Sequence, residues 1–146
     1  MQYLSSNYKR NYSISIIFLY TVPPRSLTIS SDGETFSNSS SVTVIETIDR
    51  EFTCLADGAT PPADLNWKFD GQPTDPDKDN EETPDTIDSR LTDTTSNKTI
   101  SPVWSSHHGK YLQCESIQGS ILPPEVTSVI FDVKGNHAVL SCISDS

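Results

Sequence analysis

Three cysteines and three histidines are the residues of this chain best suited to nucleophilic or metal chemistry. A reactive thiolate needs a nearby base, and a zinc site usually includes a close pair of ligands such as Cys-x-x-Cys. Cys54, Cys114 and Cys142 form no such pair, and none of the histidines stands at a spacing known to serve a cysteine nucleophile; these are His107, His108 and His137. The pattern therefore argues against a catalytic cysteine and against a zinc site.

Carboxylates are concentrated between Gln72 and Asp88, in QPTDPDKDNEETPDTID. A calcium loop of the EF-hand type that opened at Asp75 would need Gly at position 80 and Glu at position 86, where the chain has Asn80 and Thr86. With three prolines and almost nothing to bury, the segment is predicted to be a solvated, mobile loop that protease cuts early. We expect neither a metal nor a cofactor, and no buried pair of carboxylates for acid and base catalysis.

The composition argues against several further kinds of ligand. The 146 residues carry a formal net charge of -10, from 20 acidic and 10 basic side chains. Binding to DNA or to an anionic membrane would therefore gain nothing from counterion release. The six glycines are scattered, and none lies in a loop that could cradle phosphate. Nucleic acids and small-molecule substrates are therefore not expected, and no group of residues suggests an enzyme.

Residues 1–21 precede the part of the chain with regular strand patterning. The apolar run Ile16 to Tyr20, with Ile14 before it, is far shorter than the about 20 residues that a membrane-spanning helix needs. Lys9 and Arg10 ahead of this run are typical of a secretory signal, although a small-residue cleavage site is missing. Two interpretations stay open, a weak signal peptide or a disordered or artefactual leader.

The region from Val22 to Val133 has the pattern of an all-β domain. Its apolar clusters are short, β-rich and bounded by Pro, Gly, Asn, Asp or Ser, with no sustained helical spacing. Seven short strands favour a two-layer sandwich. They are expected near Ser26 to Ser30, Ser41 to Glu46, Arg50 to Leu55, Leu65 to Phe69, Thr95 to Pro102, Lys110 to Ser116 and Val126 to Val133.

Alternation along three of these strands predicts the core. Residues two apart in a strand face the same side, so each cysteine or tryptophan that points inward brings its second neighbours inward as well. The side shared with these residues is apolar on all three strands, whereas the other side is mostly polar. The predicted inward set is Phe52, Cys54, Leu65, Trp67, Phe69, Leu112 and Cys114. This agreement supports a two-layer core.

The cysteines and the tryptophan also carry a resemblance to a known family. Cys54, in FTCLADGATPPADLNWKFDG, is followed by Trp67 on the next predicted strand and by Cys114 in NKTISPVWSSHHGKYLQCES. This arrangement resembles an immunoglobulin-like domain, and the resemblance covers residues 22–134. It implies an antiparallel β-sandwich of two sheets, a disulfide between Cys54 and Cys114 that joins the sheets, and Trp67 packed on that bond.

Further details are similar to the second type of constant-set immunoglobulin domain, found in adhesion receptors of the Kirre, nephrin and nectin kind. The VPP that begins at Val22 and the later VTSVIFDV fit that pattern. Leu112 departs from it, because the commoner sequence has a corner tyrosine there and Tyr111 is shifted outward. Lys98 also departs, at an inward position two residues before Ile100. Either the sheet edge frays at Lys98, or its aliphatic stem carries the charge outward.

The tail, residues 135–146, contains the third cysteine in NHAVLSCISDS. The alternation of Ala138, Leu140 and Cys142 resembles the cysteine-bearing strand of another immunoglobulin domain, so the tail is predicted to begin a truncated second domain. The alternative is that Cys142 is a free or intermolecular thiol.

The resemblance implies an extracellular location, either secreted or on the cell surface, and binding to proteins without turnover. The first hypothesis is a binding module of a cell-adhesion or cell-recognition receptor that binds a like or an unlike receptor. The alternative is a secreted immune-type decoy or effector with a single domain. The sequons at Asn11, Asn38 and Asn97 are candidate glycosylation sites that fit either hypothesis.

Two surfaces are candidates for protein contact. The first is the outward side of the sheet that carries the Trp67 and Cys114 strands, where Tyr111, Lys68, Gln113 and Ile130 are expected to lie together. The same residues also fit an ordinary sheet face with a cross-strand aromatic pair. The second is the loop from Ile117 to Glu125, which contains Ile121 and Leu122.

Overall fold

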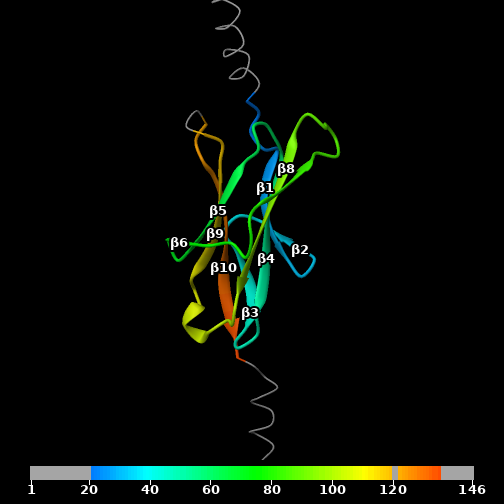
Figure 1. Cartoon of the computed structure of the whole chain (residues 1–146). Helices are drawn as coiled ribbons and strands as arrows, with labels where there is room; N and C mark the ends of the chain where they lie inside the picture. The colour runs from blue at the N-terminus through cyan, green and yellow to red at the C-terminus, as the bar shows by residue number, and fades with distance from the viewer. Residues whose placement is uncertain (1–20, 120–121, 136–146) are drawn as a thin grey trace, which may run out of the picture.

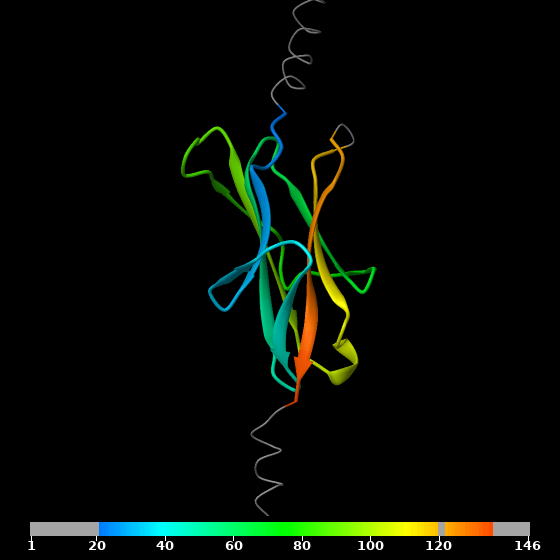
Figure 2. The same ribbon diagram turned by 180° about the vertical axis from the view of Figure 1, so that it is seen from behind.

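The computed structural model describes residues 21–119 and 122–135, which form two packed β-sheets (Figures 1 and 2). The first sheet has the order β2-β1-β4-β8-β7. Its strands are β1 (Ser26–Ser31), β2 (Glu34–Phe36), β4 (Arg50–Ala59), β7 (Glu81–Pro84) and β8 (Thr92–Ile100). The second sheet has the order β3-β10-β9-β5-β6. Its strands are β3 (Ser40–Ile45), β5 (Asp64–Phe69), β6 (Gln72–Thr74), β9 (Tyr111–Ile117) and β10 (Glu125–Lys134). One 3-10 turn, η1 (Ser105–His107), lies between β8 and β9. The predicted all-β sandwich is confirmed.

One strand pair departs from the predicted antiparallel arrangement. β10 pairs with β3 in parallel, from Val129 opposite Ser40 to Lys134 opposite Ile45, so the second sheet is mixed. A hairpin forces its two strands to be antiparallel, but no hairpin joins β3 to β10. The chain instead reaches β3 from β2, which belongs to the other sheet. The predicted two-sheet sandwich therefore has one parallel pair at this edge, while the other described strand pairs are antiparallel.

The acidic segment Gln72 to Asp88 is also more ordered than predicted. It contributes β6, which pairs with β5, and β7, which pairs with β8. Asp70 and Gly71 have positive φ angles of 52° and 82°, and they make the tight turn that folds β6 back on β5. All four residues of β7 are exposed, so this strand carries no hydrophobic alternation that the sequence could reveal. The prediction of a loop without strands is wrong for these two elements.

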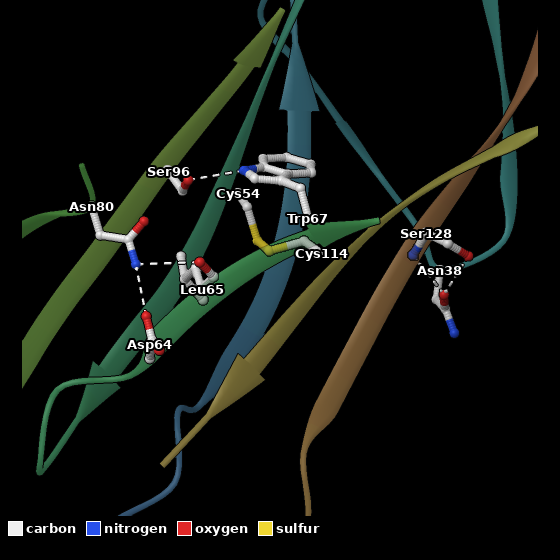
Figure 3. The surroundings of a disulfide bond; sticks show 9 residues. All are labelled: Asn38, Cys54, Asp64, Leu65, Trp67, Asn80, Ser96, Cys114 and Ser128. Atoms are coloured by element: carbon white, nitrogen blue, oxygen red, sulfur yellow. Dashed lines mark hydrogen bonds between the residues drawn. A yellow bond between two sulfur atoms is a disulfide. The ribbon is translucent and has the colours of Figure 1, made fainter. Parts of the chain in front are cut away.

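The predicted core is confirmed, and it lies between the sheets. Cys54 on β4 and Cys114 on β9 form a disulfide with a Cα–Cα distance of 6.4 Å, which joins the two sheets (Figure 3). Closing a loop of 60 residues stabilises the fold by about 4 kcal/mol in the chain-entropy model. Phe69 is half-buried and packs against this core. The largest buried side chains include Trp67, Phe52, Phe131, Ile29, Leu112 and Val44.

The inward side of β8 is polar where the other core strands are apolar. Ser96 is buried there, and its hydroxyl accepts a hydrogen bond of 2.9 Å from the indole nitrogen of Trp67 (Figure 3). This bond gives the buried indole N–H a partner in place of the water that it loses on folding. Lys98 stays within β8, opposite Phe52, and its ammonium donates to the backbone oxygen of Asp75 at 2.7 Å. The edge does not fray at Lys98.

Within the described residues, no helix is long and apolar enough to cross a membrane.

Candidate functional site

The first predicted surface is the solvent-facing side of the β3-β10-β9-β5-β6 sheet, which we call the outer face. Ile130 on β10 lies opposite Tyr111 on β9, and Gln113 on β9 lies opposite Lys68 on β5. Because β9 alternates strictly between buried and half-buried residues, Tyr111 and Gln113 share the side that points away from the core. The four residues that the sequence grouped together are therefore neighbours on three adjacent strands.

Tyr111 is held at the end of the outer face by the β5–β6 turn. Its backbone oxygen accepts a hydrogen bond of 2.9 Å from the N–H of Asp70. Its hydroxyl lies 3.3 Å from the position that a Cβ atom on Gly71 would occupy. The half-buried ring therefore leans over this turn, which fixes its direction and leaves the remainder of the side chain open to solvent.

Two exposed apolar side chains of β10 lie on the outer face, one opposite Tyr111 and one opposite Glu115. Ile130 is 38% exposed and Val126, four residues earlier on the same side of β10, is 49% exposed. Charged groups surround them in weak surface pairs, such as Lys110 and Asp70 at 3.9 Å and Lys134 and Asp132 at 3.4 Å. An aromatic and aliphatic centre with a polar rim suits contact with another protein.

The second predicted surface is only partly described. Ile121 lies outside the described residues. Leu122 is half-buried, and it lines a small cavity of about 240 Å³ together with Pro23, Pro24 and Gln118. The side-chain amide of Gln118 donates to the backbone oxygens of Val22 (3.0 Å) and Pro61 (2.8 Å). Leu122 therefore packs against the point where the chain enters the sandwich and offers less free apolar area than the outer face.

The glycosylation candidates lie in different surroundings. Asn38 is exposed in the turn between β2 and β3. Asn97 is half-buried within β8, and its side-chain oxygen accepts a hydrogen bond of 2.8 Å from the Thr53 hydroxyl. Asn11 and Cys142 lie outside the described residues.

The sequence missed a cluster of three aspartates at the end of the sandwich where the chain enters. Carboxylate oxygens of Asp57, Asp85 and Asp93 lie within 4.8 Å of one another. Arg25 donates to Asp85 at 2.5 Å and to Asp57 at 3.0 Å, so its guanidinium supplies positive charge to the group. These carboxylates could hold a cation by geometry alone, but Arg25 already occupies their shared side. The four residues come from distant positions in the chain, and no spacing signal marks them.

Two of these carboxyl groups have pKa values that are shifted in opposite directions. The backbone N–H of Asp88 donates to the carboxylate of Asp85 at 2.8 Å and lowers its pKa well below the usual range; hydrogen bonds from Asp93 and Arg25 act in the same direction. Burial raises the pKa of Asp93, and its contact with Asp85 raises that pKa further. Asp93 is therefore the member of the pair that takes up a proton first. Together with Arg25, the cluster joins the residue before β1 to β4, to β8 and to the loop after β7.

Comparison with known proteins gives one family and several similar folds. The family model described as "Immunoglobulin domain" matches residues 23–116. The crystal structure of Rst D1-D2 superposes with a TM-score of 0.63 at 17% identity, and covers 78% of this chain and 51% of that one. The full ectodomain (Ig1–Ig3) of mouse nectin-like molecule 4 gives 0.61 at 19% identity, with 79% and 35% covered. The chain thus spans about half and about a third of these two structures. No curated protein matches the chain.

Proposed function

Since this chain belongs to the immunoglobulin domain family, we propose that it is an extracellular protein-binding module of a cell-adhesion or cell-recognition receptor. It acts by surface contact, without turnover. The core leaves no room for a ligand between the sheets, because the inward side chains fill that space at the density of a protein interior. Function therefore belongs to the outside of the sandwich.

The observation that carries the proposal is the outer face around Tyr111 and Ile130. A tyrosine can bury a large area at low entropic cost, and the exposed Ile130 opposite it extends the apolar centre. Lys68 and Gln113 supply polar edges on the adjacent strands. At Ile130 and Gln113 the backbone is paired with a neighbouring strand on both sides, which holds these positions in place.

An extracellular location is supported by the disulfide. A structural disulfide in a small domain persists in an oxidising compartment and is rare in the cytosol. One of the similar structures is described as an ectodomain, which agrees with this location. We propose that the partner is another protein of the receptor type, and the binding experiment below distinguishes a second copy of this chain from a different receptor.

The test uses the full chain, multimerised on beads and screened against cells that each display one receptor ectodomain, this chain included. Ile130→Asp places a charge at the centre of the outer face and is expected to weaken binding to the recognised receptor at least tenfold, which corresponds to about 1.4 kcal/mol. Thr28→Asp places the same charge on the outer side of the other sheet, at a half-buried position, and is the matched control.

The proposal predicts that only Ile130→Asp reduces binding, while both variants melt close to the parent temperature. Equal binding by the parent and Ile130→Asp would remove the outer face as the contact surface. Loss of binding with Thr28→Asp alone would move the site to the other sheet.

A further inference from the structure

β10 has an uncovered edge next to one of the sequons. On one side, β10 pairs with β9 from Glu125 to Ile130. On its other side, β3 covers only Val129 to Lys134. Among the described residues, the first four of β10 therefore have no strand partner at this edge, and the uncovered stretch includes the exposed side chain of Val126.

The uncovered edge carries free backbone groups. At Ser128, the edge is closed by the turn before β3, because the Ser39 N–H donates to the Ser128 oxygen at 2.8 Å and the Asn38 side-chain oxygen accepts from the Ser128 N–H at 3.0 Å. Alternate residues of a strand direct their backbone groups to the same side, so Val126 directs its N–H and C=O toward this edge, where no described strand pairs with it. Such an edge is a template for pairing with another chain.

The side chain of Asn38 is arranged so that its nitrogen is available. Its oxygen accepts from both the N–H and the hydroxyl of Ser128, at 3.0 and 3.3 Å. Figure 3 shows the nitrogen directed away from Ser128. In the described part of the chain no hydrogen bond to this nitrogen is found, and the residue is exposed. A sugar attached to the nitrogen would leave both bonds to Ser128 in place.

The sequon of Asn38 lies in the turn that leads into β3, and the bonds to Ser128 join it to β10. Ser39 has a positive φ of 63°, and the hydroxyl of Ser40 donates to the Ser37 oxygen, three residues earlier, at 2.7 Å. The segment thus lies at the start of an edge strand, with the side chain of Asn38 exposed.

The sequon of Asn97 is tied to distant parts of the fold. The hydroxyl of Thr99, the third residue of this sequon, donates to the carboxylate of Asp77 at 2.6 Å. The backbone N–H of Asp77 donates to the backbone oxygen of Asn97 at 2.8 Å. Lys98 holds the same segment through Asp75. Asn97 is also half-buried within β8, whereas Asn38 is exposed, so a glycan has less room at Asn97.

We propose that Asn38, and not Asn97, carries an N-linked glycan, and that this glycan shields the uncovered edge of β10 from pairing with a second copy of the chain. In the attachment step the Asn38 nitrogen attacks C1 of an oligosaccharide carried on a lipid diphosphate. The C1–N bond forms, the C1–O bond to the diphosphate breaks, and the nitrogen loses one proton.

The attachment is tested by directing the full chain into the secretory pathway of eukaryotic cells and releasing glycans with an amidase in heavy-oxygen water. Release converts a glycosylated asparagine into a labelled aspartate, which peptide mass spectrometry locates. The label is expected on the Asn38 peptide and not on the Asn97 peptide. Asn38→Asp and Ser40→Ala should lose one glycan, while Ser40→Thr should keep it. An unlabelled Asn38, or a labelled Asn97, would overturn the assignment.

The shielding is tested on the secreted proteins by sedimentation at increasing concentration. Asn38→Asp keeps an oxygen for the Ser128 bonds but has no glycan, so it is expected to self-associate at concentrations where the parent is monomeric. Val126→Lys added to Asn38→Asp should restore the monomer, because a charge on an open edge disfavours pairing. A monomeric Asn38→Asp, or self-association that Val126→Lys leaves unchanged, would refute shielding even with Asn38 glycosylated.

Discussion

At the scale of single residues, substitutions of Tyr111 test whether its ring serves binding or the stability of the fold. Tyr111→Ala removes the ring from the outer face and is expected to weaken binding to the receptor that the bead screen finds by more than about 1 kcal/mol, as hot-spot truncations do. Tyr111→Phe keeps the ring above Gly71 and should preserve stability. Binding assays and thermal melting of both variants check the prediction. A loss of stability in Tyr111→Ala as large as its loss of binding would mark the ring as a packing residue.

The aspartate cluster makes two opposite predictions about stability and pH. The folded pKa of Asp93 is raised above its ordinary value of 3.8, so ionising Asp93 costs stability as pH rises through the folded pKa. Asp93→Asn cannot ionise, and its oxygen can still accept the Gly58 N–H bond of 2.8 Å. The variant should melt at a higher temperature than the parent at neutral pH. This difference in melting temperature should vanish below pH 3.8, the ordinary pKa of an aspartate.

Asp85 should behave in the reverse manner. Its folded pKa is lowered, so its charge stabilises the fold above the ordinary value of 3.8, and this contribution is lost as pH falls through the lower folded pKa. Asp85→Asn should therefore melt at a lower temperature at neutral pH, because Arg25 loses its buried partner. Melting curves of both variants across the acid range provide the check; equal effects of the two substitutions would contradict the assigned proton sharing.

At the scale of elements, β7 is the strand held least firmly. All four of its residues are exposed, and only β8 pairs with it. Glu81 and Glu82 lie in this edge strand, so a glutamate-specific protease is expected to cut there first. Because Cys54 and Cys114 lie on either side of the cut, the disulfide should hold the two fragments together. They should separate only after the disulfide is reduced. First cleavage elsewhere in the sandwich would contradict this ranking.

The elements that the sequence predicted are those with an apolar side. Alternation around Cys54, Trp67 and Cys114 gave the core strands, and the same alternation placed Tyr111 and Ile130 on one face. β6 and β7 bury too little to leave such a pattern. Contacts such as Trp67 to Ser96, or Arg25 to Asp85, join residues that only the folded chain brings together. The parallel pairing of β3 likewise depends on how the chain crosses between sheets.

At the scale of the whole molecule, the two ends of the described region lie at opposite ends of the sandwich (Figure 1). Tension applied through Val22 and Lys134 therefore runs along the strands. Such tension would pull β10 along its length past β3. The six paired positions between the two strands would then resist the shear force together.

Once the sheets separate under tension, the disulfide limits how far the chain can lengthen. The 60-residue loop between Cys54 and Cys114 stays closed, so it withholds about 200 Å of extended chain, at about 3.4 Å per residue. Single-molecule stretching should thus give a longer extension, by about that length, when a reductant is present and the force has exposed the bond. In the proposed role at a junction between cells, the intact bond would limit how far the stretched domain lengthens and keep it able to refold.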